Sequence, residues 1–325
     1  QEIICGGRYV SGDDPMRVFA CGQSSNLTIE VTWRNGSHSA VHNVRPNHLC
    51  EVFEAVATRV TEESPSPIAH RPSPIPEPLF EDASHLLNHK HREEPFDDFA
   101  RQPLLPNRLS QLGPGVAWFD LDGDGRDDLV IPSGKGGKLA IYRNDPQNGF
   151  LLLESPALNR PITRDQTTAL GWTPSPGKNS LLIGAANYED GSTNGEAVAR
   201  FDFENGNLNS VAGLPSQTAS VGPLALADID ADGRLELFVG SRVISGRYPE
   251  AASSHIHRYD GQRWQFEEAN SRVLESFGLV SGAVWSDLNG DGYPELILAC
   301  EWGPLRIFKN ERGRLIALNP PVTLA

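Results

Sequence analysis

The sequence FDLDGDGRDDLV, residues 119–130, places five aspartates within nine positions, between two apolar segments. Like charges at this density repel one another, so the loop needs solvent or a counter-ion to stabilise it. Asp120, Asp122 and Asp124 alternate, Gly125 follows them, and Asp128 comes four residues after Asp124. Alternating carboxylates before a glycine let the chain curl around one hard cation such as calcium, which takes about six to eight oxygen ligands. The spacing therefore predicts a cation-binding loop.

The flanks of this loop indicate which kind of cation site it is. A helix–loop–helix calcium site carries a glutamate at its twelfth position, and the twelfth residue counted from Asp120 is Ile131. The flanking segments GVAWF (115–119) and DLVIP (128–132) are short, β-branched and aromatic, which is typical of strands. We therefore predict a strand–loop–strand site. For a single copy, a solvated acidic turn is the alternative.

The acidic frame occurs three times in the chain. The copies in LADIDADGRLELFVG (226–240) and WSDLNGDGYPELILA (285–299) also have an apolar strand on each side. Three copies with one spacing disfavour a chance acidic turn, and an internal repeat determines the whole fold. At the acid positions these two copies carry Asp228, Asp230, Asp232 and Glu236, and Asp287, Asn289, Asp291 and Glu295.

A further unit is predicted between the first two acidic loops. Asp120 and Asp228 are 108 residues apart, whereas Asp228 and Asp287 are 59 apart, so the first interval has room for two units. The segment TTALGWTPSPGKNSLLIGAANY (167–188) keeps the strand–turn–strand pattern, with Gly177 in register. We predict no ion there, because its residues at the four acid positions are Trp172, Pro174, Pro176 and Ser180.

Each unit contains more than one hairpin. After the first acidic loop come KLAIYRND (138–145) and FLLLE (150–154), and the last unit repeats this order with LRIFKN (305–310) and RLIALN (314–319). Four short strands in about 55 residues are typical of a propeller blade, which must stack on neighbours to bury its faces. The predicted fold class is all-β: a small β module followed by four blades of an incomplete β-propeller over residues 81–325.

The loop pattern D-x-D-x-D-G-x-x-x-[DE] resembles the FG-GAP/VCBS repeats of integrin-type propellers. In that family the loop binds calcium, so the resemblance implies about three Ca2+ sites, with side-chain ligands at the acid positions of the three loops. It also implies that the residue between the third acid and the last acid adds a backbone carbonyl. These residues are Arg126, Arg234 and Tyr293.

The N-terminal region differs from the repeats. LTIEVTW (27–33) and SAVHNV (39–44) alternate in polarity and flank Asn35-Gly36, which predicts a hairpin. Residues 1–58 are similar to the ASPIC/UnbV module of the cartilage-acidic-protein-like family, in the segments GGRYVSGDD (6–14), RVFACG (17–22), IEVTWRNG (29–36) and CEVFE (50–54). That module usually begins some strands earlier. We therefore expect an N-terminally truncated module and a fragment of a larger bacterial protein.

Two segments connect the module to the repeats. Residues 59–80 contain six prolines, Pro65, Pro67, Pro72, Pro74, Pro76 and Pro78, which predicts a stiff extended linker. Residues 85–115 resemble the lead-in to a second propeller, which implies that they protect strand edges. Their histidines, His85, His89 and His91, lie near several acids, yet the spacing matches no zinc or iron motif. Cys21 and Cys50 could form a bridge or remain free thiols.

Composition excludes several classes of function. The net charge is −14, the pI is about 5.1, and no basic stretch exists, which argues against a nucleic-acid partner. No apolar run approaches the roughly 20 residues of a membrane-spanning helix. Loops with three or four carboxylates suit millimolar calcium, so we expect a secreted, periplasmic or cell-surface location.

Two functions from different classes fit these observations. The first is a calcium-binding extracellular propeller that acts as a binding or adhesion module for a protein or glycan partner. The alternative is a propeller-scaffolded enzyme that acts on glycans or phosphoesters. We find no G-x-S-x-G or H-E-x-x-H motif, so binding is favoured. A concave pocket on the axial face, with polar groups not bound to metal, would discriminate between the two classes. Several tryptophans on one open face would favour sugar binding; the strand tryptophans, expected in the core, are Trp118, Trp172, Trp285 and Trp302.

Overall fold

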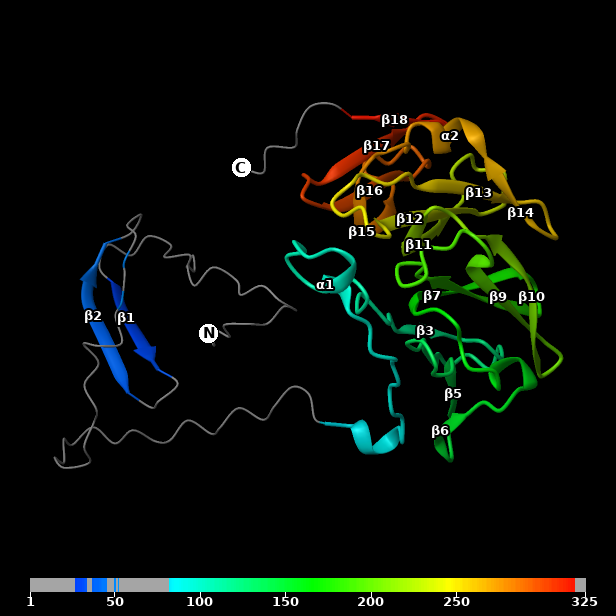
Figure 1. Ribbon diagram of the computed structural model, residues 1–325, viewed down its shortest axis with the longest axis horizontal. Coiled ribbons are helices and arrows are strands. Elements are labelled where there is room, and N and C mark those ends of the chain that lie inside the picture. The colour runs from blue at the N-terminus through cyan, green and yellow to red at the C-terminus, as the bar shows by residue number, and fades with distance from the viewer. Residues whose placement is uncertain (1–26, 34–36, 46–49, 51, 53–81, 319–325) are drawn as a thin grey trace. The chain divides into compact units, whose positions relative to one another are not determined.

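A computed structural model describes residues 27–33, 37–45, 50, 52 and 82–318 (Figure 1). Contacts divide the chain into two units, residues 1–81 and 82–325, and each unit is described by itself. None of the helices in the described ranges has the length and apolar character that crossing a membrane would require.

The described part of the first unit is one antiparallel pair of strands, β1 (Leu27–Thr32) and β2 (His38–Val44). Burial alternates along β1, as a strand with one covered face requires. Next to the turn, Trp33 N–H donates to the Ser37 carbonyl at 2.8 Å. The two predicted strands are thus confirmed. The Asn35-Gly36 turn, Cys21 and the proline-rich linker lie outside the described residues.

The second unit contains four four-stranded antiparallel sheets, in which every strand pairs with the next one along the chain. The predicted blades, including the one hidden between the first two acidic loops, are therefore confirmed. The first blade comprises β3 (Ala117–Phe119), β4 (Asp128–Ile131), β5 (Ala140–Asp145) and β6 (Gly149–Leu152). The second comprises β7 (Gln166–Ser175), β8 (Lys178–Ala185), β9 (Glu196–Glu204) and β10 (Asn207–Pro215). The third comprises β11 (Ala219–Ala227), β12 (Glu236–Ile244), β13 (His255–Tyr259) and β14 (Trp264–Glu267). The fourth comprises β15 (Leu279–Ser286), β16 (Glu295–Glu301), β17 (Arg306–Asn310) and β18 (Leu315–Ala317).

Among the described residues, the helical segments are short and lie outside the sheets. They are the 3-10 turns η2 (Ser84–Leu86) and η3 (Pro156–Leu158) and the helices α1 (Asp98–Arg101) and α2 (Glu268–Arg272). Consecutive blades meet through their first strands, since β3 contacts β7, β7 contacts β11, and β11 contacts β15 (Figure 1).

The core consists of layers between successive blades. Successive residues of a strand point to opposite faces, so a blade with two neighbours needs apolar residues on both faces. In β8, Leu181 and Ile183 pack toward the first blade, whereas Leu182 packs toward the third. The third layer joins the third and fourth blades around Phe238 and Phe308. This two-sided burial explains why the second strands read as nearly continuous apolar runs.

The tryptophans divide between core and surface. Trp172 and Trp285 pack in the layers between blades, as expected. The expectation is wrong for Trp118 and Trp302, which are 54% and 75% exposed. Trp118 lies on the first blade, on the face away from the second blade, and Trp302 follows the end of β16. They belong to different blades and form no common aromatic face.

Residues 87–112 cover part of the blades. Leu87 packs on Leu129 and Tyr142 of the first blade, on the side that no described blade covers. Further on, Leu105 and Leu109 pack against Tyr248 at the end of the third blade. The segment therefore covers a blade face and lies across strand ends, whereas its resemblance implied that it protects strand edges.

One buried carboxylate holds this segment together. Asp98 accepts hydrogen bonds from Leu109 N–H at 2.7 Å, Ser110 N–H at 2.8 Å and the Ser110 hydroxyl at 2.6 Å. It is fully buried. The neighbouring histidines are engaged otherwise: His91 lies 3.3 Å from Glu93, and His89 faces the Tyr142 hydroxyl at 3.4 Å.

Replacement of Asp98 tests the role of this anchor. Asp98→Ala removes the acceptor of three buried donors, so we expect a loss of about 3 kcal/mol in the free energy of unfolding. Urea denaturation followed by fluorescence measures the loss. Asp97→Ala is the matched control, because Asp97 is an exposed cap of the same helix and accepts only Ala100 N–H; its loss should not exceed about 1 kcal/mol. Equal losses from the two substitutions would contradict the anchor.

Candidate metal centres

The three acidic loops share one backbone frame. The first acid of each loop, Asp120, Asp228 or Asp287, accepts through Oδ2 the N–H of the glycine five residues later, at 2.9, 2.8 and 2.9 Å. Its Oδ1 accepts the N–H of the third acid, at 3.1 Å in each loop. The glycines, Gly125, Gly233 and Gly292, have φ values of +86°, +84° and +86°, a left-handed conformation that glycine adopts without steric cost. The turn therefore requires the glycine that follows the third acid in each loop.

The last acid of each loop is buried at the start of the second strand. Asp128, Glu236 and Glu295 are 1%, 0% and 2% exposed. Each accepts the N–H of the residue that follows the first acid, at 3.1, 3.0 and 2.9 Å. Burial raises the pKa of Asp128, and it raises the pKa of Glu236 to about 7. In a solvated acidic turn this carboxylate would be exposed, whereas here it is buried.

Two of the loops bring three carboxylates together. Asp120, Asp122 and Asp124 each offer an oxygen within 4.8 Å of the others. Asp228, Asp230 and Glu236 do the same in the third blade. Oxygen atoms bound to one calcium at about 2.3–2.6 Å lie within such distances of one another. An all-oxygen donor set suits a hard cation such as calcium or magnesium rather than zinc or copper.

The loop of the fourth blade keeps the frame with a different donor set. Asn289 replaces the second acid; its Oδ1 accepts Asp291 N–H at 2.8 Å, and its Nδ2 donates to Glu295 at 3.2 Å. Within the described residues, Asp287, Asp291 and Glu295 do not converge as a three-acid group. In all three loops the residue expected to add a carbonyl lies in the same turn, and its N–H donates to the third acid, at 2.9, 2.8 and 2.9 Å for Arg126, Arg234 and Tyr293.

The corresponding turn of the second blade is a tight hairpin. Trp172 pairs with Ser180 across β7 and β8, and Ser175 pairs with Lys178, so only Pro176 and Gly177 lie between the strands. Trp172 is buried in the core, and the Ser180 hydroxyl donates to Asp202 at 2.8 Å. The strand–turn–strand prediction is confirmed. The blade adopts the same sheet without any carboxylate at the four acid positions.

Asparagines from other segments brace two of the acidic loops. Asn179, in the second blade, donates to the carbonyls of Asp120 and Leu121 at 3.1 and 3.0 Å. Asn310, in the fourth blade, donates to the Ile229 carbonyl at 2.8 Å. Leu121 and Ile229 occupy the same position in their loops and are buried. The loops of the first and third blades are therefore fixed by the blade that follows each of them.

Basic residues on the third strands were missed by the sequence reasoning. Arg258 pairs across β12 and β13 with Glu236, and its guanidinium contacts Asp230 and lies 3.0 Å from the Glu236 carboxylate. In the first blade, Arg143 Nε donates to Asp122 at 2.6 Å. Each arginine therefore supplies positive charge to an acidic loop. The cross-strand register would have identified these arginines, but the spacing of residues in the loops does not determine that register.

In the second blade, the charge is reversed at the third-strand position that pairs with the last acid position. Ser180 stands where the other blades carry the last acid, and its cross-strand partner is Asp202. Asp202 in turn binds Arg200 at 2.7 Å and Lys178 at 3.0 Å. In the fourth blade the position following Phe308 is Lys309, which pairs with Glu311 at 3.0 Å. A basic third-strand residue thus contacts the acidic loop in the first and third blades, whereas in the second blade the residue opposite Ser180 is acidic.

Comparisons with known proteins agree with the N-terminal assignment. A family profile described as ASPIC and UnbV matches residues 1–59. A search of the curated proteins finds no match to this chain.

Among solved structures, this chain is similar to BBS1N in complex with ARL6DN, with 14% identity over 64% of this chain and 55% of that chain, at a TM-score of 0.35. It is similar to puromycin hydrolase, with 15% identity over 63% of this chain and 31% of that chain, at a TM-score of 0.39. It is also similar to a thermostable family-43 glycoside hydrolase, with 13% identity over 61% of this chain and 72% of that chain, at a TM-score of 0.37. This chain thus spans about half of the first of these structures. At such identities and scores the likenesses carry no argument about function.

Proposed function

We propose that residues 82–325 act as a calcium-loaded binding module of the FG-GAP/VCBS type. The module binds a protein or glycan partner in a secreted, periplasmic or cell-surface location, and neither nucleic acid nor a membrane span belongs to this function. One observation carries the proposal: three loops far apart in the sequence repeat the same carboxylate frame, down to the same pattern of backbone hydrogen bonds.

The burial of the last acid supports a bound cation. A carboxylate that is removed from water is destabilised unless opposite charge and hydrogen bonds compensate it. Glu236 accepts the Ile229 N–H, and the Arg258 guanidinium lies 3.0 Å from its Oε1. Arg258 alone neutralises only part of the charge of three neighbouring carboxylates, and a divalent ion shared by Asp228, Asp230 and Glu236 would neutralise the rest. Calcium is favoured over magnesium, because its larger and flexible shell accepts irregular sets of protein oxygens.

The acids outside the loops bear on the enzyme alternative. A glycosidase requires two carboxyl groups placed across a cleft. At the end of the blades away from the acidic loops there is a cavity, and Asp165 is the only acid among the described residues that line it. Outside the acidic loops, the Glu189 and Asp165 carboxylates interact, and the pKa of each is raised by burial. A propeller-scaffolded enzyme that acts on glycans or phosphoesters therefore stays the alternative.

The third-strand arginines set the strength of the ion sites. Arg258 and a calcium ion would share Asp230 and Glu236, so they compete for the same oxygens. Arg143 stands in the same relation to Asp122. The arginines neutralise the loops when the ion is absent and weaken ion binding when it is present. Such weakening suits an environment with millimolar calcium.

Chelation tests the proposed ions. Removal of calcium leaves mutually repelling carboxylates, so we expect EDTA to lower the melting temperature and calcium to restore it better than magnesium. One site at a hundredfold excess of ligand over Kd stabilises the fold by about 2.7 kcal/mol. Asp122→Ala and Asp230→Ala should each remove part of the calcium response, measured by calorimetry. Pro174→Ala, at the matching position of the second blade, is the control and should retain it. A melting curve indifferent to EDTA would mean that the loops are acidic turns only.

Removal of the arginine tests the competition. We expect Arg258→Gln to tighten calcium binding about tenfold, because the screened repulsion between the guanidinium and the ion disappears. Isothermal titration with calcium, after removal of bound metal, measures the affinity. Arg263→Gln is the matched control, since Arg263 is an exposed arginine of the same hairpin. Weaker binding by Arg258→Gln would instead make this arginine a residue that positions the acids.

A further inference from the structure

Trp302 is a large apolar side chain that is left in solvent at the end of the blades opposite the acidic loops. It is 75% exposed, and it lies in the turn between β16 and β17. The acidic loop of the same blade joins β15 to β16, so Trp302 is at the other end of the sheet. The proposed calcium sites therefore give this tryptophan no role.

The backbone of Trp302 is strained. Its φ is +60°, in the left-handed region that bulky side chains rarely adopt. The next residue is Gly303, yet the turn places the positive φ on the tryptophan and not on this glycine. Among the described non-glycine residues with a positive φ, Trp302 is the only aromatic one. The turn by itself would favour glycine or asparagine at position 302, and residues held in such strain cluster at ligand sites.

Hydrogen bonds hold the indole by its edge. Trp302 Nε1 donates to the Tyr248 hydroxyl, which itself donates to Glu301 at 2.6 Å. Tyr248 is buried, and its N–H donates to the Gln102 side chain of the covering segment (residues 87–112) at 3.1 Å. The ring therefore has a fixed orientation before any ligand arrives, while most of its surface stays accessible. Such preorganisation lowers the entropic cost of binding.

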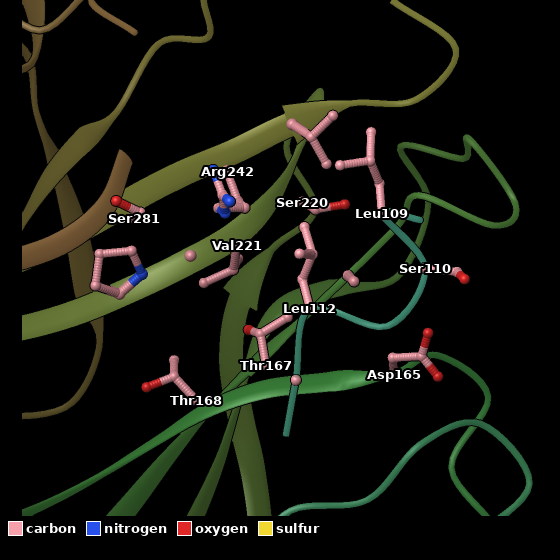
Figure 2. A pocket seen from close by; sticks show the side chains of 15 residues that line it. Leu109, Ser110, Leu112, Asp165, Thr167, Thr168, Ser220, Val221, Arg242 and Ser281 are labelled. Carbon is pink, nitrogen blue, oxygen red and sulfur yellow. The ribbon is translucent and has the colours of Figure 1, made fainter. Parts of the chain in front are cut away.

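The charged groups beside this network are already engaged. Arg242 lies 2.6 Å from Glu301, which also accepts the Tyr248 hydroxyl. Arg242 lines the cavity at this end of the blades, and Figure 2 shows it among the lining side chains. The next charged residue along the chain, Arg306, lies over the Phe277 ring at 5.6 Å. An anion thus finds Arg242 paired, and a cation finds Glu301 paired, so an uncharged ligand suits this position.

A sugar ring matches a single exposed indole face. The indole face carries partial negative charge, and the C–H groups on one face of a sugar ring carry partial positive charge. A proline-rich peptide instead docks in a groove lined by aromatic side chains, and a quaternary ammonium group takes a cage of aromatic rings. In the part of the chain that the structure describes, no aromatic ring stacks on Trp302, so neither groove nor cage forms around it.

We propose that Trp302 binds one neutral sugar residue, which stacks its ring face on the exposed indole. The inference rests on the proposed binding function and names the ligand class that the module takes. The same chemistry comes from a free monosaccharide or from the terminal residue of a glycan.

Saturation-transfer NMR on the full chain with calcium tests the site. The probes are free glucose, galactose, mannose, xylose and fucose, and the same sugars as terminal residues of immobilised glycans in a binding assay. We expect at least one sugar to bind, with the strongest transfer to the C–H protons of one ring face. Binding of the free sugar identifies a monosaccharide site, and binding of the immobilised form alone identifies a glycan end; either result supports the proposal. Binding of no sugar, or of only choline or a hexaproline peptide, would overturn it.

Variants locate the binding. Trp302→Asn removes the ring, and asparagine tolerates the left-handed conformation, so the melting temperature should stay the same or rise. Sugar binding should weaken about tenfold or more. Trp118→Asn is the matched control, because Trp118 is an exposed tryptophan of the first blade, and it should bind normally.

Two outcomes would overturn the assignment. One is unchanged sugar binding by Trp302→Asn. The other is a marked fall in its melting temperature, which would make Trp302 a structural residue. Because calcium-dependent melting is measured separately, loss of the sugar site leaves the ion sites standing, and the reverse also holds.

Discussion

The packing of one sheet face on the next is the constraint on which the second unit depends. Leu181 and Ile183 point to one neighbouring blade and Leu182 points to the other, so a middle blade is stable only between two others. Stacking through the first strands brings the turn between the first and second strands of every blade to the same end. For this reason the acidic loops all lie at one end of the stacked blades. The first residues of the first strands lie at the other end, together with the covering segment.

The second blade shows which features of the turn the fold itself requires. Its hairpin keeps the sheet with Trp172 in the core and Ser180 at the last acid position. Carboxylates are therefore unnecessary for the turn, and in the other blades they need a separate explanation. The cross-strand residue changes with them: Arg258 faces Glu236, whereas Asp202 faces Ser180. In the second and third blades, the buried carboxylate near this position thus has a basic partner in the same blade.

The sequence predicted what depends on local periodicity and spacing. Four units, their hairpins and the glycine turns follow from alternating apolar residues and from the frame around Asp120, because both are properties of short segments. The residues that contact this frame were not predictable from the sequence. Arg143 and Arg258 contact the loops because the pairing of strands places them there, and Asn179 contacts one loop from another blade. The same applies to the cavity, whose wall combines residues that are more than 100 positions apart in the sequence. Exposure of Trp302 was missed for a similar reason, since it lies beyond the end of its strand.

The two ends of the blades are linked only through the packed layers between them. Leu121 and Ile229, next to the first acids, are buried, and Asn179 and Asn310 tie their carbonyls to neighbouring blades. The ion proposed for these loops would therefore stabilise the contact between blades rather than the opposite end directly. The cavity lies where β7, β11 and β15 come together, so its shape depends on that same contact. The braces of the acidic loops and the walls of the cavity thus depend on the same contacts between blades.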